Sequence, residues 1–401
     1  MVLSGQFSVQ PDVASGRAHD GFLGLLNEEA LAGGRAADAL FDAGAGSRED
    51  LLRANPSWLR VGTLRALLAY ARQEFDRDPS LARELTEFVL NHVQEVAPPS
   101  EDTAFLVLQL HGTAWKEHGN ALFMLSRLEE ALSAANRSVE IFSTDPFHIV
   151  YRASARVLVA LVMHAQHRNG EAILVLDEAI AVYAEHSEPR GYIAAIQVRA
   201  MIALDDSRYA NARDDYRAAR SEAERIGDER EQIRIDHNLA LCALRLGELE
   251  VARDYMTTSF LGFSKHRMDG ELQRAIWLTA AIEKERGDLD VALELLHSVY
   301  GRFLERGMVT EAAQVLIQLG DVITEMTGRL GDAKEMCARL AVTLGRYDVP
   351  ANVRVAVAHL KETSAAAASV AALRAALREV NAFLSEFLVS PSAVFHPAPT
   401  E

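Results

Sequence analysis

The chain has 401 residues, of which 49% are hydrophobic, 24% charged and only 7% aromatic, a length that allows one large core or two to three ordinary domains. Its 41 basic and 57 acidic side chains give a formal net charge of −16 and form no Lys- or Arg-rich run, which argues against a nucleic-acid partner. The absence of any stretch of about 18 uncharged apolar residues argues against a membrane-spanning helix.

The first predicted part, residues 1–46, is a flexible N-terminal segment with weak helix. Residues 1–22 show neither the basic nor the apolar region of a secretory signal. Residues 19–46 are rich in Gly and Ala, and their few large apolar side chains can dock on the same chain, which we slightly favour, or on a partner.

Residues 47–97 are predicted to form N-terminal capping helices. A short helix precedes a helix pair that divides at Asp78-Pro79, where Pro79 suits the first position of a helix. Pro98 and Pro99 then interrupt the chain.

Residues 98–347 carry an internal period of forty. Small residues recur at this spacing, with one step of 41, at Gly119, Ala160, Ala200, Ala240, Ala280 and Gly320. Alanines follow about twelve residues after each, at Ala131, Ala172, Ala212, Ala252, Ala292 and Ala333. Two helices of about 13 to 17 residues with two short turns fill such a period. Because closely crossing helices need small residues, the pattern predicts about six stacked antiparallel helix pairs.

The segments "NLALCALRLGELEVARDY" (238–255) and "WLTAAIEKERGDLDVALELL" (277–296) resemble the tetratricopeptide repeat family. Both have a small residue in the first helix, Gly near the turn and Ala twelve residues on. The forty-residue period exceeds the usual 34 and is similar to the elongated arrays of bacterial regulators. The resemblance implies an all-α, right-handed solenoid whose concave groove binds a protein or peptide.

After the repeats, residues 348–389 are predicted to form C-terminal capping helices. The second of these has an apolar stripe that includes Leu373, Leu377, Val380 and Leu384. Residues 390–401 contain three prolines and are expected to be a disordered tail.

No residue pattern in the chain indicates catalysis or a cofactor. His164 and His167 are the best metal-ligand pair, but zinc needs three or four ligands. His237 and Cys242 are five residues apart and therefore face different sides of a helix. Cys242 and Cys337 lie far apart in apolar sequence, which favours packing roles and a reducing, cytoplasmic compartment. An all-α hydrolase, which would need clustered acids in a deep pocket, is the least favoured alternative.

Offsets from the small residues predict which side chains of the first helices face the groove. These are Lys116, Asn120, Phe123, His164, Gln197, Arg234, His237, Arg245, Arg274, Trp277 and Lys284. A basic, partly aromatic stripe suited to an acidic or carboxylate-bearing partner is formed by Arg234, Arg245, Arg274 and Lys284 with Trp277. Pairing of these cations with Asp and Glu of adjacent helices is the equally weighted alternative. Lys116 and Asn120 resemble the start of a two-carboxylate clamp, but the following repeats do not continue it.

The sequence therefore predicts a non-catalytic scaffold or adaptor that binds a protein or peptide in its groove, in a bacterial regulatory, signalling or defence system. The alternative is a ligand- or peptide-gated sensor without its own DNA-binding domain. Neither a metal nor another cofactor is expected, and the oligomeric state is left open.

Overall fold

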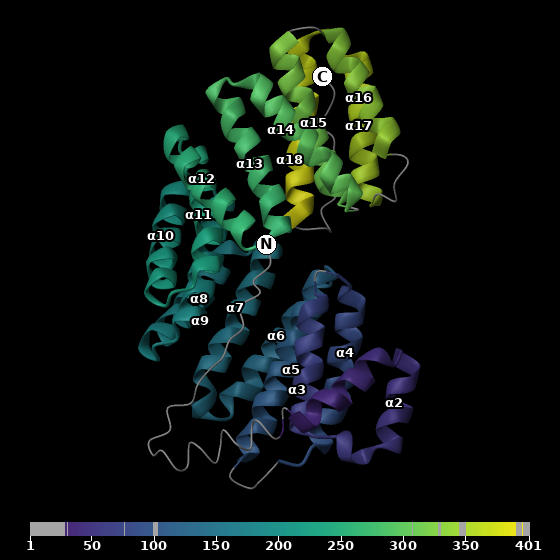
Figure 1. Cartoon of the computed structure of the whole chain (residues 1–401), viewed down its shortest axis with the longest axis vertical. Coiled ribbons are helices and arrows are strands. Elements are labelled where there is room, and N and C mark those ends of the chain that lie inside the picture. The colour runs from purple at the N-terminus through teal and green to yellow at the C-terminus, as the bar shows by residue number, and fades with distance from the viewer. Residues whose placement is uncertain are drawn as a thin grey trace. The chain divides into compact units, whose positions relative to one another are not determined.

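A computed structural model describes residues 29, 31–75, 77–98, 103–306, 308–327, 330–344, 350–389 and 395 of the chain (Figure 1). Within these ranges the ordered elements are α-helices and short 3-10 turns, and no strand is present. The prediction of an all-α fold is therefore confirmed. The predictions of flexibility for most of residues 1–46 and of disorder for 390–401 fall largely outside the described residues.

The chain divides into two compact units, Met1–Asp206 and Ser207–Glu401, which are described separately below. The dividing position lies inside the predicted repeat region, at the turn between two helices. The predicted boundaries at residues 47, 98 and 348 remain predictions.

Unit 1 begins, within its described part, with a helix over residues 31–42 that buries Ala37 and Leu40 in the core. Its further helices are α2 (Ala45–Ala54), α3 (Val61–Glu74), α4 (Pro79–His92), α5 (Ala104–Met124), α6 (Leu128–Ser143), α7 (Ile149–Ala165), α8 (Asn169–Glu185) and α9 (Pro189–Asp205). Pro79 opens α4 as predicted, and the Asp78 carboxylate caps that helix by accepting a hydrogen bond from the Leu81 amide. Consecutive helices pack as antiparallel neighbours.

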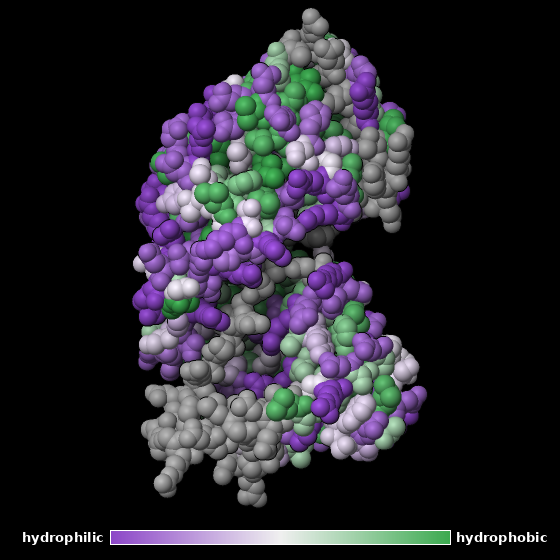
Figure 2. Space-filling model, in the orientation of Figure 1, coloured by the Kyte–Doolittle hydropathy of each residue, from purple (hydrophilic) through white to green (hydrophobic). Residues whose placement is uncertain are grey.

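Unit 2 contains α10 (Tyr209–Arg225), α11 (Glu229–Arg245), α12 (Leu249–Lys265), α13 (Asp269–Arg286), α14 (Leu289–Glu305), α15 (Val309–Thr327), α16 (Leu330–Leu344), α17 (Ala351–Ala366) and α18 (Val370–Val389). The helices from α10 to α15 stack in chain order. The last helix, α18, returns along the unit and packs on α15, although α16 and α17 separate the two in sequence (Figure 1). In Figure 2, the visible face of unit 2 shows a band of hydrophobic atoms bordered by hydrophilic ones.

The residues of the forty-residue register lie in the buried interior of the array. Ala160, Ala200, Ala240 and Ala280 have exposed fractions of 0%, as do all the partner alanines from Ala131 to Ala292. At Gly119 an added Cβ would lie 3.0 Å from the Leu158 side chain and 3.3 Å from the Ala131 carbonyl oxygen. Larger side chains at these positions would force the helices apart, which is why the sequence keeps them small.

The turns reveal a shorter repeat than the sequence pattern suggested. From His167 to Gly287, a residue with positive φ recurs every twenty residues, at His167, Ser187, Ser207, Gly227, Gly247, Arg267 and Gly287. At most of these turns the next amide donates to the carbonyl five residues earlier, as from Arg168 to Met163 at 2.9 Å. This hydrogen bond is typical of a Schellman turn. Both kinds of turn, within a hairpin and between hairpins, therefore have one geometry.

One stretch of the described residues, Pro146–Ala165, is long and apolar enough to cross a membrane by length and composition. It comprises a 3-10 turn and α7, which packs between α6 and α8. The core position of α7 accounts for its apolar composition, since Ala153, Leu158 and Val162 are buried there.

Candidate functional site

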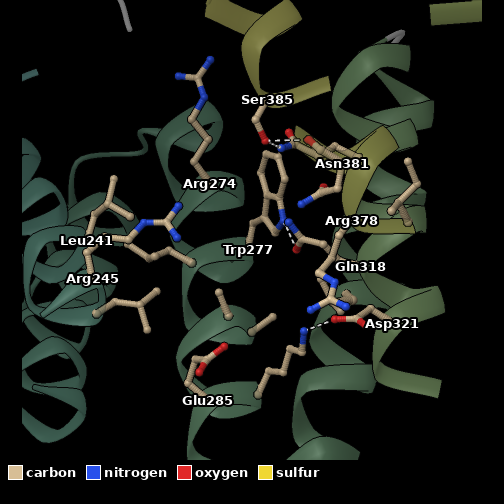
Figure 3. Close-up of a pocket in the computed structure, with 18 of the residues that line it drawn as sticks. Leu241, Arg245, Arg274, Trp277, Glu285, Gln318, Asp321, Arg378, Asn381 and Ser385 are labelled. Atoms are coloured by element: carbon tan, nitrogen blue, oxygen red, sulfur yellow. Dashed lines mark hydrogen bonds and ion pairs between the residues drawn. The ribbon is translucent and has the colours of Figure 1, made fainter. Parts of the chain in front are cut away.

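Unit 2 contains an open cavity of about 630 Å³ between α11, α13, α15 and α18 (Figure 3). Five residues that the sequence analysis predicted to face a groove line it: His237, Arg245, Arg274, Trp277 and Lys284. We call this cavity the unit 2 groove. The structure thus brings together side chains from two successive repeats and from the C-terminal helix.

Arg245 and Arg274 are the exposed cations that α11 and α13 contribute to the unit 2 groove. They extend from α11 and α13 (Figure 3), and neither guanidinium has an ion pair or a side-chain hydrogen bond with any described residue. An exposed arginine keeps its hydration and its charge, and it can pair with a carboxylate through two parallel hydrogen bonds. This side of the groove therefore offers free cationic charge.

Two other predicted cations are already paired. Lys284 forms a close ion pair with Asp321, which also faces Arg374 of α18 at 3.9 Å. Arg234 lies 3.2 Å from Glu231 and 3.4 Å from Glu271, and it is not among the residues that line the cavity. For these two residues the alternative interpretation of the sequence, pairing with neighbouring acids, describes the structure better.

Trp277 and His237 give the groove its aromatic part. The Trp277 indole N–H donates to Gln318 Oε1 at 2.7 Å, and the ring meets Phe303 edge-on at 5.7 Å between centroids. Burial and the neighbouring Arg274 lower the pKa of His237 to about 4, so its ring is neutral at pH 7. The anion-binding capacity of this wall at neutral pH therefore comes from the arginines.

The opposite wall consists of residues that the repeat pattern did not identify. From α15 and α18 these are Gln314, Gln318, Asp321, Arg378, Asn381 and Ser385. The sequence offsets from the small residues cover the first helices of the first five repeats. They therefore do not reach α15 or the C-terminal helix. The amphipathic stripe of α18 was visible in the sequence, but its packing partner α15 was not.

In unit 1, Lys116 and Asn120 surround a buried acid. The Glu117 carboxylate is 2% exposed and accepts hydrogen bonds from Arg72 Nε at 2.7 Å and from Asn120 Nδ2 at 2.8 Å, while Lys116 Nζ lies 3.2 Å away. Burial alone would raise the pKa of Glu117, but Arg72 and Lys116 lower it to about 2. Lys116, with Arg72, thus neutralises a carboxylate of its own helix, and Asn120 hydrogen-bonds to it.

The remaining predicted residues of unit 1 are largely enclosed. His164 hydrogen-bonds to Asp205 at 2.9 Å and to Asn169 at 2.8 Å, and Gln197 is only 2% exposed. Phe123 packs against the core of its repeat. His164 bonds to oxygen through both ring nitrogens, and these hydrogen bonds raise its pKa against the lowering effect of burial. None of the five predicted residues of unit 1 is among those that line the unit 2 groove.

The remaining candidates for chemistry lie outside the groove. Cys242 and Cys337 are free, buried thiols, and burial raises their pKa values to about 12 and about 11. These thiols are therefore unreactive at neutral pH. Among the described residues, no group of three or more His, Cys, Asp and Glu side chains is placed to hold a metal ion.

Solved structures share this architecture at low sequence identity. The apo form of the quorum sensor NprR from B. thuringiensis superimposes with a TM-score of 0.58 and 14% identity over 92% of this chain and 99% of that protein. A Rap protein complexed with Competence and Sporulation Factor superimposes with a TM-score of 0.51 and 16% identity over 92% of this chain and 99% of that protein. A signal transduction ATPase with a tetratricopeptide repeat sensor, from Pyrococcus horikoshii, superimposes with a TM-score of 0.53 and 13% identity over 86% of this chain and 53% of that protein.

The fold is tetratricopeptide-like. This confirms the resemblance drawn from the alanine register, although no protein-family model and no curated protein sequence matches the chain. At these identities the likeness establishes the fold, and the function must be argued from the groove itself.

Proposed function

We propose that this chain is a non-catalytic regulator that binds a short peptide in the unit 2 groove, with an acidic group of the peptide at Arg245 and Arg274. The observation that carries the proposal is that these two exposed arginines line a cavity and have no partner among the described residues. The cavity volume of about 630 Å³ lies within the range of small-ligand sites. It suits a few residues of a peptide better than a whole partner helix.

The charge of the groove contrasts with the charge of the molecule. A protein with a net charge of −16 repels anions on average, so a local pair of unpaired arginines selects where an acidic ligand can bind. Trp277, beside the arginines, offers apolar area to a peptide side chain. Both features favour a carboxylate-bearing peptide over a neutral one.

The similar proteins support a sensory role. One is described as a quorum sensor and another was solved with Competence and Sporulation Factor. By analogy, we place this chain in the cytoplasm of a bacterium, in a regulatory, signalling or defence pathway that a peptide controls. This role combines the adaptor and peptide-gated readings of the sequence, and it assigns no catalytic residue.

Tryptophan fluorescence tests the proposal directly. The chain has three tryptophans, and replacing Trp58 and Trp115 with Phe leaves Trp277 as a reporter in the groove. We expect a pool of random hexapeptides rich in Asp and Glu to change this fluorescence at lower concentration than a matched neutral pool. Arg245→Met and Arg274→Met should each weaken the acidic pool about tenfold, since a hydrogen bond to a charged group contributes about 1.5–3 kcal/mol.

The matched control is Arg302→Met. Arg302 is an exposed arginine of α14 that lies outside the lining of the groove. Its replacement should leave peptide binding within twofold. Equal binding of the acidic and neutral pools would show that the groove does not select acidic peptides. Equal losses of peptide affinity in all three variants would show the same.

A further inference from the structure

The wall formed by α15 and α18 contains a buried hydrogen-bond acceptor without a partner. Gln314 is 6% exposed and lines the unit 2 groove, and its Oε1 accepts no hydrogen bond from any described residue. An unpaired polar atom in a buried position is costly in free energy, because it has lost water without gaining a substitute. Because this atom lies at a cavity, a ligand can supply the missing hydrogen-bond donor.

The neighbouring hydroxyl fixes which end of the Gln314 amide is free. Ser385 Oγ donates its proton to the Asn381 carbonyl oxygen at 2.9 Å, and in this arrangement the hydroxyl accepts from Gln314. The Gln314 atom that contacts Ser385 is then the donor, Nε2. This hydrogen-bond arrangement assigns Oε1 as the unpaired atom.

A second unpaired oxygen lies on the adjacent helix. Asn381 Oδ1 of α18 is buried and also lacks a partner, and its side chain lies beside Ser385 and Trp277 (Figure 3). By contrast, Gln318 Oε1 is occupied by the Trp277 indole. This wall thus combines one satisfied amide with two unsatisfied ones, all uncharged.

We propose that Gln314 and Asn381 form a subsite that accepts hydrogen bonds from main-chain N–H groups of the bound peptide. This inference rests on the proposed function of the groove. Neutral acceptors suit peptide amides, which donate without charge and recur along any sequence. The C-terminal helix α18, which is not part of the forty-residue register, would then contribute directly to ligand binding.

The two walls then determine the orientation of the bound peptide in the groove. Its acidic group lies toward α11 and α13, where Arg245 and Arg274 are free, and its main chain crosses toward α15 and α18. Arg378, an exposed cation of α18, also lines the groove and lies near Gln318 and Asp321 (Figure 3).

The test compares two peptide pools on the full-length protein. One is the acidic hexapeptide pool, and the other is the same pool with N-methylated main-chain amides, which cannot donate. Retention of each pool is measured by mass spectrometry after rapid gel filtration. The wild-type protein should retain the N-methylated pool at least about tenfold less, and Gln314→Met and Asn381→Leu should each reduce this ratio to threefold or below.

Two control variants separate ligand binding from folding. Gln314→Glu keeps an acceptor at the same position and should keep the tenfold ratio. Gln166→Met changes a glutamine of unit 1 that hydrogen-bonds to Glu129, and it should also leave the ratio unchanged. Melting curves of each variant show whether a lost ratio merely follows from unfolding.

The possible results distinguish the two proposals. If the wild-type protein retains neither pool, the proposed peptide-binding function fails. If it retains both pools equally, or if Gln314→Met and Asn381→Leu keep the full ratio while folded, peptide binding stands but the main-chain subsite is wrong.

Discussion

The Glu117 cluster of unit 1 and the groove of unit 2 use their cations differently. In unit 1, Lys116 and Arg72 surround the buried carboxylate of Glu117. In unit 2, Arg245 and Arg274 line a cavity without an ion pair to any described residue, whereas Lys284 beside them is paired with Asp321. A cation on the first helix of a repeat is therefore paired at some positions and unpaired at others, and only the unpaired ones can bind an acidic ligand without breaking an ion pair.

The cause of this difference is the burial of the acid. A carboxylate that is 2% exposed must be neutralised by neighbours, because burial of an unpaired charge is strongly unfavourable. Among the described residues, neither Arg245 nor Arg274 forms an ion pair with an acid, so both guanidinium groups can contact a ligand. The following predictions test this comparison.

The largest expected effect is an acid-dependent loss of stability in unit 1. The pKa of Glu117 is about 2 in the folded protein against 4.5 for the free group, so its contribution is complete above pH 4.5 and is lost as pH falls toward 2. The free energy of unfolding should drop by roughly 3 kcal/mol through this group. Unfolding can be followed through Trp58 and Trp115, both in unit 1, in a Trp277→Phe background.

Glu117→Gln is the control for this effect. It removes the titrating group and should flatten the corresponding part of the pH profile. An unchanged acid profile in this variant would mean that Glu117 is not the responsible carboxylate.

The next prediction compares a variant of unit 1 that should lose stability with a variant of unit 2 that should lose peptide binding. Arg72→Met leaves Glu117 short of a partner and should lower the stability of unit 1 by about 2 kcal/mol, less than for a fully buried pair since Arg72 is half exposed. Arg245→Met should change stability by less than about 0.5 kcal/mol. Denaturant titrations and the peptide-pool assay should therefore give opposite rankings for the two variants. The same ranking in both assays would contradict the comparison.

A smaller effect concerns His164 in unit 1. Hydrogen bonds to Asp205 and Asn169 raise its pKa, so the stabilisation is complete below the unfolded value of 6.5 and is lost as pH rises through the folded one. The loss should be about 1 kcal/mol, because Asp205 is partly solvated. Urea unfolding between pH 6 and 9 measures it. His164→Gln, which cannot be charged, should show no such decline.

The smallest effect is expected at Arg234 in unit 2. This half-buried arginine pairs with Glu231 and Glu271 outside the lining of the groove. Arg234→Met should cost about 0.2–1 kcal/mol of stability and change peptide affinity by less than twofold. An affinity loss as large as that of Arg274→Met would place Arg234 in the site after all.

The sequence was sufficient to predict the fold because close helix packing restricts single positions to small residues. Only a small residue fits where Ala240 or Ala280 meets a neighbouring helix, so the register of small residues predicted the stacked hairpins. The same offsets select Arg274 and Trp277, which line one cavity in the structure. In both cases, residues within one or two repeats determine the result.

The rest could not be predicted because it depends on contacts that are distant in sequence. Whether Lys116 is free or paired depends on Arg72 and Glu117 in the folded state, and offsets do not describe pairing. Gln314 contacts Ser385, and lines the same cavity as Asn381, only because α18 folds back on α15. The twenty-residue repeat was also hidden, because several turns have Ser, His or Arg where Gly227, Gly247 and Gly287 mark the others.

The uniform turns have a consequence for how such a protein can change in evolution. Since the joints from His167 to Gly287 close in the same way, a duplication or deletion of forty residues joins ends that already match. The number of repeats can therefore vary without the invention of a new loop. The length of a ligand-binding surface then becomes a heritable trait that a single recombination event can alter.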